Sequence, residues 1–372
     1  MKKYLPILFF SFLFLVVVIR DANAQITFST GKMNVRVDEY GAIRIFTIDG
    51  VDTTQHINRA SFLVAGNENE VLDYWNDVEV EVPTAQVAVP EHGDHEISGT
   101  YNNQYQNFPP DVLVEQHVYG WDNENFCLIK MILTNRESNT LPTIVGLDII
   151  QYMDYTWEDD HIFYNMTNQL LEQFESHYVG IKILSEQTLS AQVFAWYASY
   201  SDFDSAYYAW MTAGTFYTDT LITDADGGVG IMAGEPTDLQ ASESRIVYMA
   251  IAAGNDEADM LNNMGVALQK YYSITSVEAD HNSIPEGFIL EQNYPNPFNP
   301  STSIKFGIPE SSNVTLKIFN SLGEEVAELV DEYMEAGTYT YNFDASKLSS
   351  GIYIYTMQTG EQLISKKMTL VK

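Results

Sequence analysis

Apolar and polar residues alternate with a period of two along most of this chain. Alternation of this kind places apolar side chains on one face of an extended strand, so each run predicts a half-buried antiparallel strand. Between residues 25 and 274 there are enough runs for roughly a dozen strands, which favours a large β-sandwich, although a closed barrel would show the same pattern. The clearest predicted strands are residues 33–37, 42–46, 78–82, 112–119, 126–134, 143–152, 178–184, 192–197 and 244–253.

Helical periodicity is convincing in one segment, residues 257–272. Its apolar side chains recur at spacings of three and four, and Asn255 and Asp256 precede it as capping candidates, which together predict an amphipathic helix. We expect this helix to pack on the sandwich and to end the large domain at residue 274. Its apolar positions are Met260, Leu261, Met264, Leu268 and Tyr271.

Residues 289–372 alternate again, but in shorter runs with glycines at the junctions. This pattern predicts about six or seven strands in a small immunoglobulin-like β-sandwich. Residues 275–288, between the two units, are polar and contain a proline, so we predict an exposed linker. The predicted fold class is therefore all-β: a large antiparallel β-sandwich domain over 25–274 with one C-terminal helix, followed by a small immunoglobulin-like β-sandwich over 289–372.

The amino-terminal segment has the pattern of a secretory signal peptide. Two lysines precede an apolar run over residues 5–19, and Ala22 and Ala24 supply the small-x-small pattern that a signal peptidase cuts. The apolar run is shorter than the roughly 20 residues that span a bilayer. We predict a signal peptide over residues 1–24, a mature chain that begins at Gln25 without a transmembrane segment, and export to the periplasm.

The charge of the chain is strongly one-sided, with 51 Asp and Glu against 18 Lys and Arg and a formal net charge of −33. Such a field repels nucleic acid and anionic membrane surfaces, so we expect neither as a partner.

Cys127 is the only cysteine, which excludes a disulfide within the chain. Because Cys127 lies in an apolar run, we predict that it is a small buried hydrophobe.

The densest acidic cluster runs from Asp148 to Asp160 and is interleaved with aromatic residues. Carboxylate pairs beside aromatic rings are typical of glycosidases, but Asp148 and Asp154 on one straight strand would lie about 20 Å apart. A solvated loop and a cation site, with calcium as the preferred ion, are the alternatives. We assign no catalytic residue and expect the three consecutive acidic residues to form an exposed loop. The candidate metal ligands are Asp154, Glu158, Asp159 and Asp160.

No histidine pattern identifies a metal centre. His92 and His95 are close in sequence, but Gly93 between them predicts a loop that offers no common face. The histidines at 56, 117, 161 and 177 are isolated from one another. Residues 224–228 contain two aspartates but lack the further oxygens of a calcium loop, so we predict an ordinary Asx turn there.

The large domain faintly resembles the large secreted bacterial β-sandwich modules that precede C-terminal sorting tails. The resemblance rests on residues 145–147, 152–154, 178–181 and 250–254, with Tyr152 where such modules carry the first Asp of an Asp-x-Asp pair. Some of these modules bind or process carbohydrate, so the resemblance implies a carbohydrate-related role at the level of the fold.

The C-terminal unit resembles the type A sorting domain of the type IX (Por) secretion system. The resemblance rests on an ordered set of motifs: the proline-rich run 293–300, a hairpin at 314–326, Ala336-Gly337-Thr338-Tyr339, the run 348–355, and the lysine-rich end 366–372. It implies recognition by the secretion machinery and its sortase. The residues that would form the sorting motif are Asn293, Tyr294, Pro295, Asn296, Pro297, Phe298, Asn299, Pro300, Gly323, Gly351, Tyr353, Lys366 and Lys372.

These patterns predict a type IX cargo protein that is secreted or held at the outer cell surface, where lipopolysaccharide or an extracellular glycan would be its partner. The hypothesis for its body is a non-catalytic β-sandwich module that binds carbohydrate and needs no cofactor. The alternative is a secreted glycan-active hydrolase or lyase that uses acidic residues of the large domain.

Overall fold

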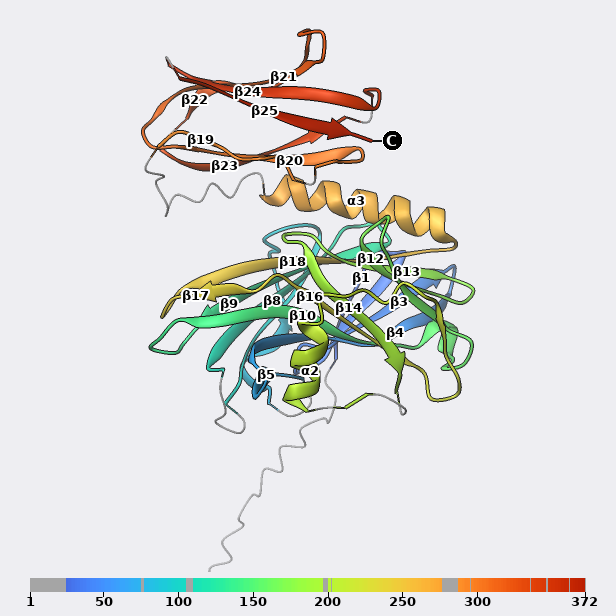
Figure 1. Ribbon diagram of the computed structural model, residues 1–372. Coiled ribbons are helices and arrows are strands. Elements are labelled where there is room, and N and C mark those ends of the chain that lie inside the picture. The colour runs from blue at the N-terminus through green and yellow to red at the C-terminus, as the bar shows by residue number, and fades with distance from the viewer. Residues whose placement is uncertain are drawn as a thin grey trace, which may run out of the picture.

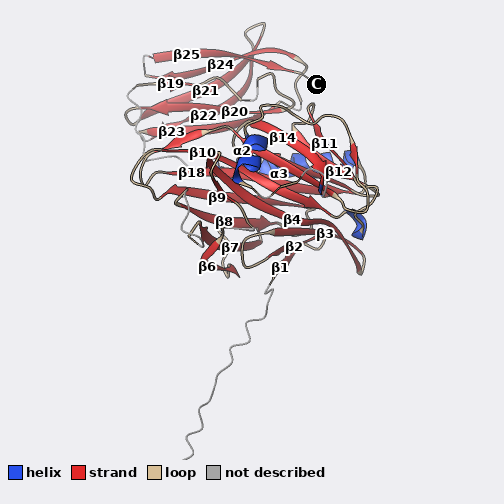
Figure 2. Ribbon diagram, turned by 60° about the horizontal axis from the view of Figure 1, so that its bottom comes forward, coloured by secondary structure: helices blue, strands red, loops and turns tan. Residues whose placement is uncertain are grey.

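The computed structural model describes residues 25–371, apart from 75–76, 105–109, 197–199, 202, 276–286, 295, 335, 346 and 361. The predicted signal peptide with Ala22 and Ala24, most of the predicted linker, Pro295 and Lys372 lie outside the described residues. Nearly all of the regular structure is antiparallel strand, as predicted for an all-β chain (Figure 2).

Two nine-stranded antiparallel sheets form the large body. The first has the order β1-β2-β3-β4-β10-β16-β14, with β5 and β17 at its side, and the second has the order β15-β11-β12-β13-β18-β9-β8-β7-β6. The first sheet contains β1 Ile26–Ser29, β2 Met33–Val37, β3 Ile43–Asp49, β4 Asp52–Asn67, β5 Glu70–Leu72, β10 Leu141–Gln151, β14 Thr188–Ala195, β16 Gly228–Gly234 and β17 Thr237–Leu239. The second contains β6 Glu79–Gln86, β7 His95–Asn102, β8 Val112–Gly120, β9 Phe126–Asn135, β11 His161–Asn165, β12 Leu170–Phe174, β13 Tyr178–Ile183, β15 Leu221–Ile222 and β18 Ser244–Gly254.

One hydrophobic core joins the inner faces of these two sheets. Ile45 and Ile149 contribute to it from the first sheet, and Ile129 and Ile251 from the second, all fully buried. Each such side chain stabilises the fold by about 1.5–3 kcal/mol relative to an exposed position. Cys127 lies in the same core, so its predicted burial is confirmed.

A helix covers part of the outer face of each sheet. The α3 helix, Glu257–Thr275, packs Met260, Met264 and Ala267 on the second sheet, which confirms the helix predicted from its periodicity. The α2 helix, Asp204–Met211, packs on the first sheet and was not predicted from the sequence. In Figure 1, α3 lies between the large body and the C-terminal sheets. No helix in the described part of the chain has the length and apolarity to cross a membrane.

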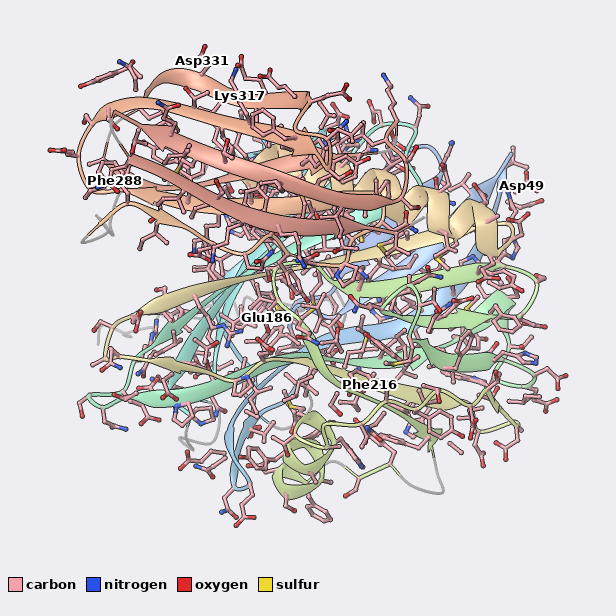
Figure 3. The ribbon with its side chains drawn as sticks, turned by 45° about the horizontal axis from the view of Figure 1, so that its top comes forward. Asp49, Glu186, Phe216, Phe288, Lys317 and Asp331 are labelled. Carbon is pink, nitrogen blue, oxygen red and sulfur yellow. The ribbon has the colours of Figure 1, made fainter. Side chains whose placement is uncertain are left out.

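The C-terminal unit has its own two sheets and its own core. A three-stranded sheet, β19-β20-β23, faces a four-stranded sheet, β22-β21-β24-β25. Among the described residues, no side chain of the large-body core belongs to the cluster between these two sheets. Phe288 packs against this second core, and Lys317 forms ion pairs with Glu325 and Glu328 (Figure 3). The strands are β19 Ile289–Leu290, β20 Ser301–Ile308, β21 Ser312–Asn320, β22 Glu325–Met334, β23 Gly337–Asp344, β24 Gly351–Thr359 and β25 Gln362–Leu370.

Candidate functional site

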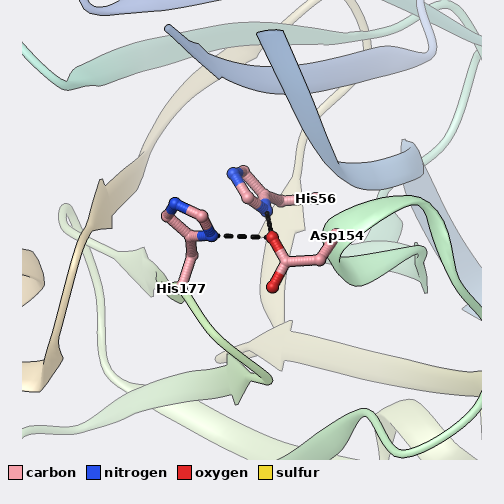
Figure 4. A group of neighbouring side chains, drawn as sticks. All are labelled: His56, Asp154 and His177. Atoms are coloured by element: carbon pink, nitrogen blue, oxygen red, sulfur yellow. Dashed lines mark hydrogen bonds and ion pairs between the residues drawn. The ribbon is translucent and has the colours of Figure 1, made fainter. Parts of the chain in front are cut away.

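Three side chains from separate segments meet just beyond the end of β10 (Figure 4). His56 belongs to β4, Asp154 to the short 3-10 helix η1, Met153–Tyr155, and His177 to the bend before β13. The backbone carbonyl of His56 accepts hydrogen bonds from Tyr152 N–H at 3.2 Å and Gln173 Nε2 at 3.1 Å. These bonds hold the segments after β10 and in β12 against β4, and so bring the three side chains together.

The backbone after β10 turns through an unusual conformation. Asp154 and Tyr155 both have positive φ, at 50° and 67°, in the left-handed region that residues other than glycine seldom adopt. The turn directs the Asp154 carboxylate back toward β4, where its Oδ1 lies 3.5 Å from His56 Nδ1 and 2.7 Å from His177 Nδ1. The other oxygen of Asp154 accepts hydrogen bonds from the backbone N–H and the hydroxyl of Ser176.

The surroundings fix the charge of two members of this group at neutral pH. Burial lowers the pKa of His56 to about 4, although the Asp154 carboxylate acts in the opposite direction. Burial alone would raise the pKa of Asp154, but the hydrogen bonds from Ser176 and the two imidazoles outweigh it and leave that pKa below its usual value. At neutral pH, a neutral His56 therefore faces an anionic Asp154.

A shallow pocket of about 330 Å³ lies beside this group. Thr156 Oγ donates a hydrogen bond of 3.4 Å to the Glu175 carboxylate across it, and burial together with Asp154 raises the pKa of Glu175. The Trp157 ring is held by Tyr152 and Trp196, at centroid distances of 4.4 and 5.5 Å. The lining residues are Thr156, Trp157, Glu158, Asp159, Glu175 and Ala225.

The four acidic residues proposed from the sequence as metal ligands occupy three different environments. Asp154 joins the two histidines, whereas Glu158 and Asp159 are exposed at the pocket. Asp160 is fully buried, so the expectation of an exposed loop is wrong for this residue. One of its oxygens accepts a hydrogen bond from Met153 N–H at 3.3 Å and the other has no partner. Burial and the neighbouring carboxylates raise the pKa of Asp160 to about 8.

Replacing Asp160 with asparagine is expected to stabilise the protein at pH 8 by about 2–4 kcal/mol, and to have little effect near pH 4. The unfolded carboxyl loses its proton near its ordinary pKa, while the folded one keeps it up to about 8. Wild-type stability therefore falls as the pH rises through this window, and asparagine removes that dependence. Urea unfolding at about pH 4, 6 and 8 measures the difference. The exposed Asp159→Asn variant is the control, and a gain that does not change with pH would contradict the prediction.

Asp148, the first member of the acidic cluster, is not part of the pocket. It is buried on the α2 side of the first sheet, where it contacts Arg59 and accepts a 2.9 Å hydrogen bond from the Tyr200 hydroxyl. The structure therefore does not bring Asp148 and Asp154 together as a carboxylate pair at this pocket.

Another histidine, His117, lies among carboxylates on β7 and β8. His117 contacts Glu96 at 2.6 Å through Nδ1 and Glu115 at 2.8 Å through Nε2, so both of its ring nitrogens have partners. His95 Nε2 lies 2.8 Å from Asp122 Oδ1.

The turn predicted at 224–228 has the expected form, since Asp226 N–H donates to Asp224 Oδ1.

The predicted sorting residues tie the two ends of the C-terminal unit together. Asn293 is buried and its N–H donates to the Tyr355 hydroxyl at 2.7 Å. Phe298 is also buried; its N–H donates to the Thr369 carbonyl and its own carbonyl accepts from Val371 N–H, both at 2.9 Å. Asn296 Oδ1 accepts from Thr369 N–H at 2.9 Å. The proline-rich run is thus hydrogen-bonded to the end of the last strand, β25.

The other predicted sorting residues lie on the surface or at strand ends. Gly323 has a φ of 81° in the turn between β21 and β22, where a side chain would be strained. Gly351 begins β24 and is exposed, while Tyr353 donates a 2.8 Å hydrogen bond to the Ser349 carbonyl. Tyr294, Pro297, Asn299 and Pro300 are exposed, and Lys366 is half-buried on β25.

A comparison with known protein families identifies the family of the C-terminal unit. Residues 292–371 match the family described as the secretion system C-terminal sorting domain, which confirms the resemblance found in the sequence. A sorting domain of this type implies engagement with the type IX secretion machinery and export to the cell surface or secretion. No match was found among curated proteins.

Several solved structures are weakly similar to the chain. A bacterial glucoamylase complexed with acarbose has 12% identity and a TM-score of 0.48, over 66% of this chain and 33% of that one. A polysaccharide lyase has 11% identity and a TM-score of 0.37, over 91% and 46%. A putative aldose 1-epimerase from Escherichia coli K12 has 11% identity and a TM-score of 0.40, over 62% and 99%. The matched part spans about a third of the glucoamylase and under half of the lyase.

Proposed function

We propose that this secretion-system cargo protein is a surface or secreted module whose large body binds an extracellular glycan at the shallow pocket beside Trp157. The route of export is through the periplasm after removal of residues 1–24. The observation that carries the proposal is the composition of the pocket, in which one firmly held indole ring borders a group of carboxylate and hydroxyl oxygens. Sugars are recognised by stacking on aromatic rings and by hydrogen bonds from their hydroxyl groups.

The charge of the pocket narrows the class of ligand. Glu158, Asp159 and Glu175 line it, and no lysine or arginine does. The whole chain carries a formal net charge of −33. Sulfated or uronate-rich chains would therefore be repelled, and a neutral or amino-sugar oligosaccharide is favoured.

Replacing Trp157 with alanine is expected to weaken oligosaccharide binding about five- to thirtyfold, since a stacked ring contributes roughly 1–2 kcal/mol. The mature protein would be screened on an array of neutral and charged glycans, and hits would be titrated by calorimetry. Tyr40→Ala is the matched control, because Tyr40 is an exposed aromatic residue on the β2–β3 turn. Equal affinity of the Trp157 variant and the wild type would refute the proposed site.

The hydrolase or lyase alternative also has an observation in its favour. Burial and the Asp154 carboxylate raise the pKa of Glu175, whereas the pKa of Asp154 itself is lowered. Carboxyl groups with divergent pKa values are a common arrangement for an acid and a base. Release of reducing ends or unsaturated sugars from the glycans that bind would favour this alternative over the binding module.

A further inference from the structure

One ring nitrogen of His56 has no hydrogen-bond partner although the side chain is fully buried. This atom, Nδ1, points at Asp154 Oδ1 from 3.5 Å (Figure 4). The other nitrogen, Nε2, lies 2.7 Å from the Thr47 hydroxyl. A buried polar atom without a partner is rare in folded proteins, and each case calls for a physical explanation.

The position of Thr47 suggests which group His56 lacks. When Nε2–H donates to the Thr47 oxygen, Nδ1 carries a lone pair that faces a carboxylate oxygen. Two such groups repel each other unless a cation lies between them. The opposite tautomer would place a proton on Nδ1, but 3.5 Å is well beyond the roughly 2.7–2.9 Å of a hydrogen bond to a charged carboxylate.

We propose that His56 Nδ1, His177 Nδ1 and Asp154 Oδ1 together bind one divalent transition-metal ion, with Zn²⁺ as the best chemical fit. Each of the three residues offers a ligand atom within 4.8 Å of the others. The ligands of tetrahedral zinc lie about 3.3 Å apart, given bonds of about 2.0–2.1 Å. Small rotations of the three side chains would close the group around an ion.

The donor atoms decide the class of metal. Two imidazole nitrogens and one carboxylate suit zinc and its neighbours in the first transition row, whereas calcium and magnesium require oxygen ligands. The calcium ion considered from the acidic sequence therefore does not suit this group. Of the four acidic candidates, Asp154 is the one that the fold places beside two histidines.

The surrounding hydrogen bonds orient two of the three ligands as they do in metal centres. Thr47 holds His56, and the backbone N–H and hydroxyl of Ser176 occupy Asp154 Oδ2. Asp154 Oδ1 faces the two imidazoles, and the ion would replace the proton that it shares with His177 Nδ1. His177 is about one-quarter exposed, so solvent reaches the group from the side of this residue. Thr156 and Glu175, each two residues from a ligand in the chain, line the pocket. The ion would therefore lie next to the pocket, although the inference does not depend on glycan binding.

The other two groups of potential ligands in the described residues lack this arrangement. In the group Glu91, Glu96 and His117, both nitrogens of the imidazole are already paired with carboxylates. The group Asp73, Asp77 and Asp204 offers only oxygen atoms. His117 therefore serves as a matched control, because it is also a histidine among carboxylates on the same body.

The test is metal binding by the mature chain after treatment with a chelator. Zinc would be titrated against a chromophoric competitor and its content measured by elemental analysis, and Co²⁺ would report the coordination by its visible absorption. We expect one ion per chain. Replacement of His177 by alanine or Asp154 by asparagine is expected to lower the zinc affinity at least about 100-fold, and Thr47→Val about tenfold. The His117→Gln variant should bind as the wild type does.

Circular dichroism would show that each variant is folded, and two partly exposed ligands are varied so that the result does not depend on the buried His56. Added zinc should raise the melting temperature of the wild type but not of the His177 and Asp154 variants. Failure of the folded wild type to bind zinc or cobalt would overturn the proposal. Unchanged affinity in both ligand variants, or an equal loss in His117→Gln, would overturn it as well.

Discussion

Replacing Arg59 with methionine is expected to lower the free energy of unfolding by about 3–5 kcal/mol, because it leaves the buried carboxylate of Asp148 without its cation. Arg59 contacts Asp148 directly, and Asp148 is 1% exposed. Burial opposes the charge of Arg59, but Asp148 and the Tyr200 and Tyr207 hydroxyls outweigh it and raise the pKa of the guanidinium. Urea unfolding at neutral pH measures the loss.

The exposed ion pair between Arg136 and Glu81, with contacts of 2.7 Å, is the matched control. Arg136→Met should cost less than about 1 kcal/mol, since solvent screens a surface pair. The double variant Arg59→Met, Asp148→Leu should recover much of the stability, because apolar side chains of similar volume can replace a buried pair. If Arg59→Met cost no more than Arg136→Met, the buried pair would not have the role described.

Strands with one buried face could be predicted from their alternation, and some runs buried on both faces, such as β9 and β10, were predicted as well. The predicted run at 112–119 became β8, Val112–Gly120, whose residues are alternately buried and half-buried over most of its length. The second half of β4 does not alternate, because residues 61–65 are all buried between the core and the outer layer that contains α2. β16 is also buried throughout and contains three glycines, and a Cβ at Gly230 would lie 2.6 Å from Leu171. From periodicity alone, such segments are assigned to turns, or to apolar runs that could be either helix or strand.

The candidate site was harder to predict than the fold. The acidic and aromatic composition around Asp154 indicated the correct segment, but neither His56 nor His177 has a spacing that connects it to this segment. Their meeting depends on the hydrogen bonds that join β4 to Tyr152 and Gln173, and on the left-handed turn at Asp154. Long-range pairing of strands is not encoded in local periodicity. The sorting tail could be recognised because its motifs lie in a fixed order within one short segment.

Deletion of residues 289–372 is expected to abolish export across the outer membrane and to leave the protein in the periplasm. The deleted segment contains all of the matched sorting domain, residues 292–371, and every buried residue of its separate hydrophobic core. We propose that residues 25–274 fold as a domain of their own, because no described residue after 274 belongs to the core between the two large sheets. The truncated body should therefore remain folded, and immunoblots of medium, cell surface and periplasm in a host with this secretion system would locate it.

The reverse experiment, in which the sorting domain is transferred to another protein, distinguishes loss of the export signal from loss of folding. A passenger protein fused between a signal peptide and residues 287–372 should reach the outer surface. The sorting domain should fold in this fusion, because its proline-rich run is hydrogen-bonded to its own last strand, β25, from Phe298 N–H to the Thr369 carbonyl. Circular dichroism of the purified truncated body should show a cooperative melt, with a small change where Tyr272 of α3 loses its hydrogen bond to Ser303. Export of the truncated chain, or an unfolded body in the periplasm, would contradict the division between a sorting tail and an independent module.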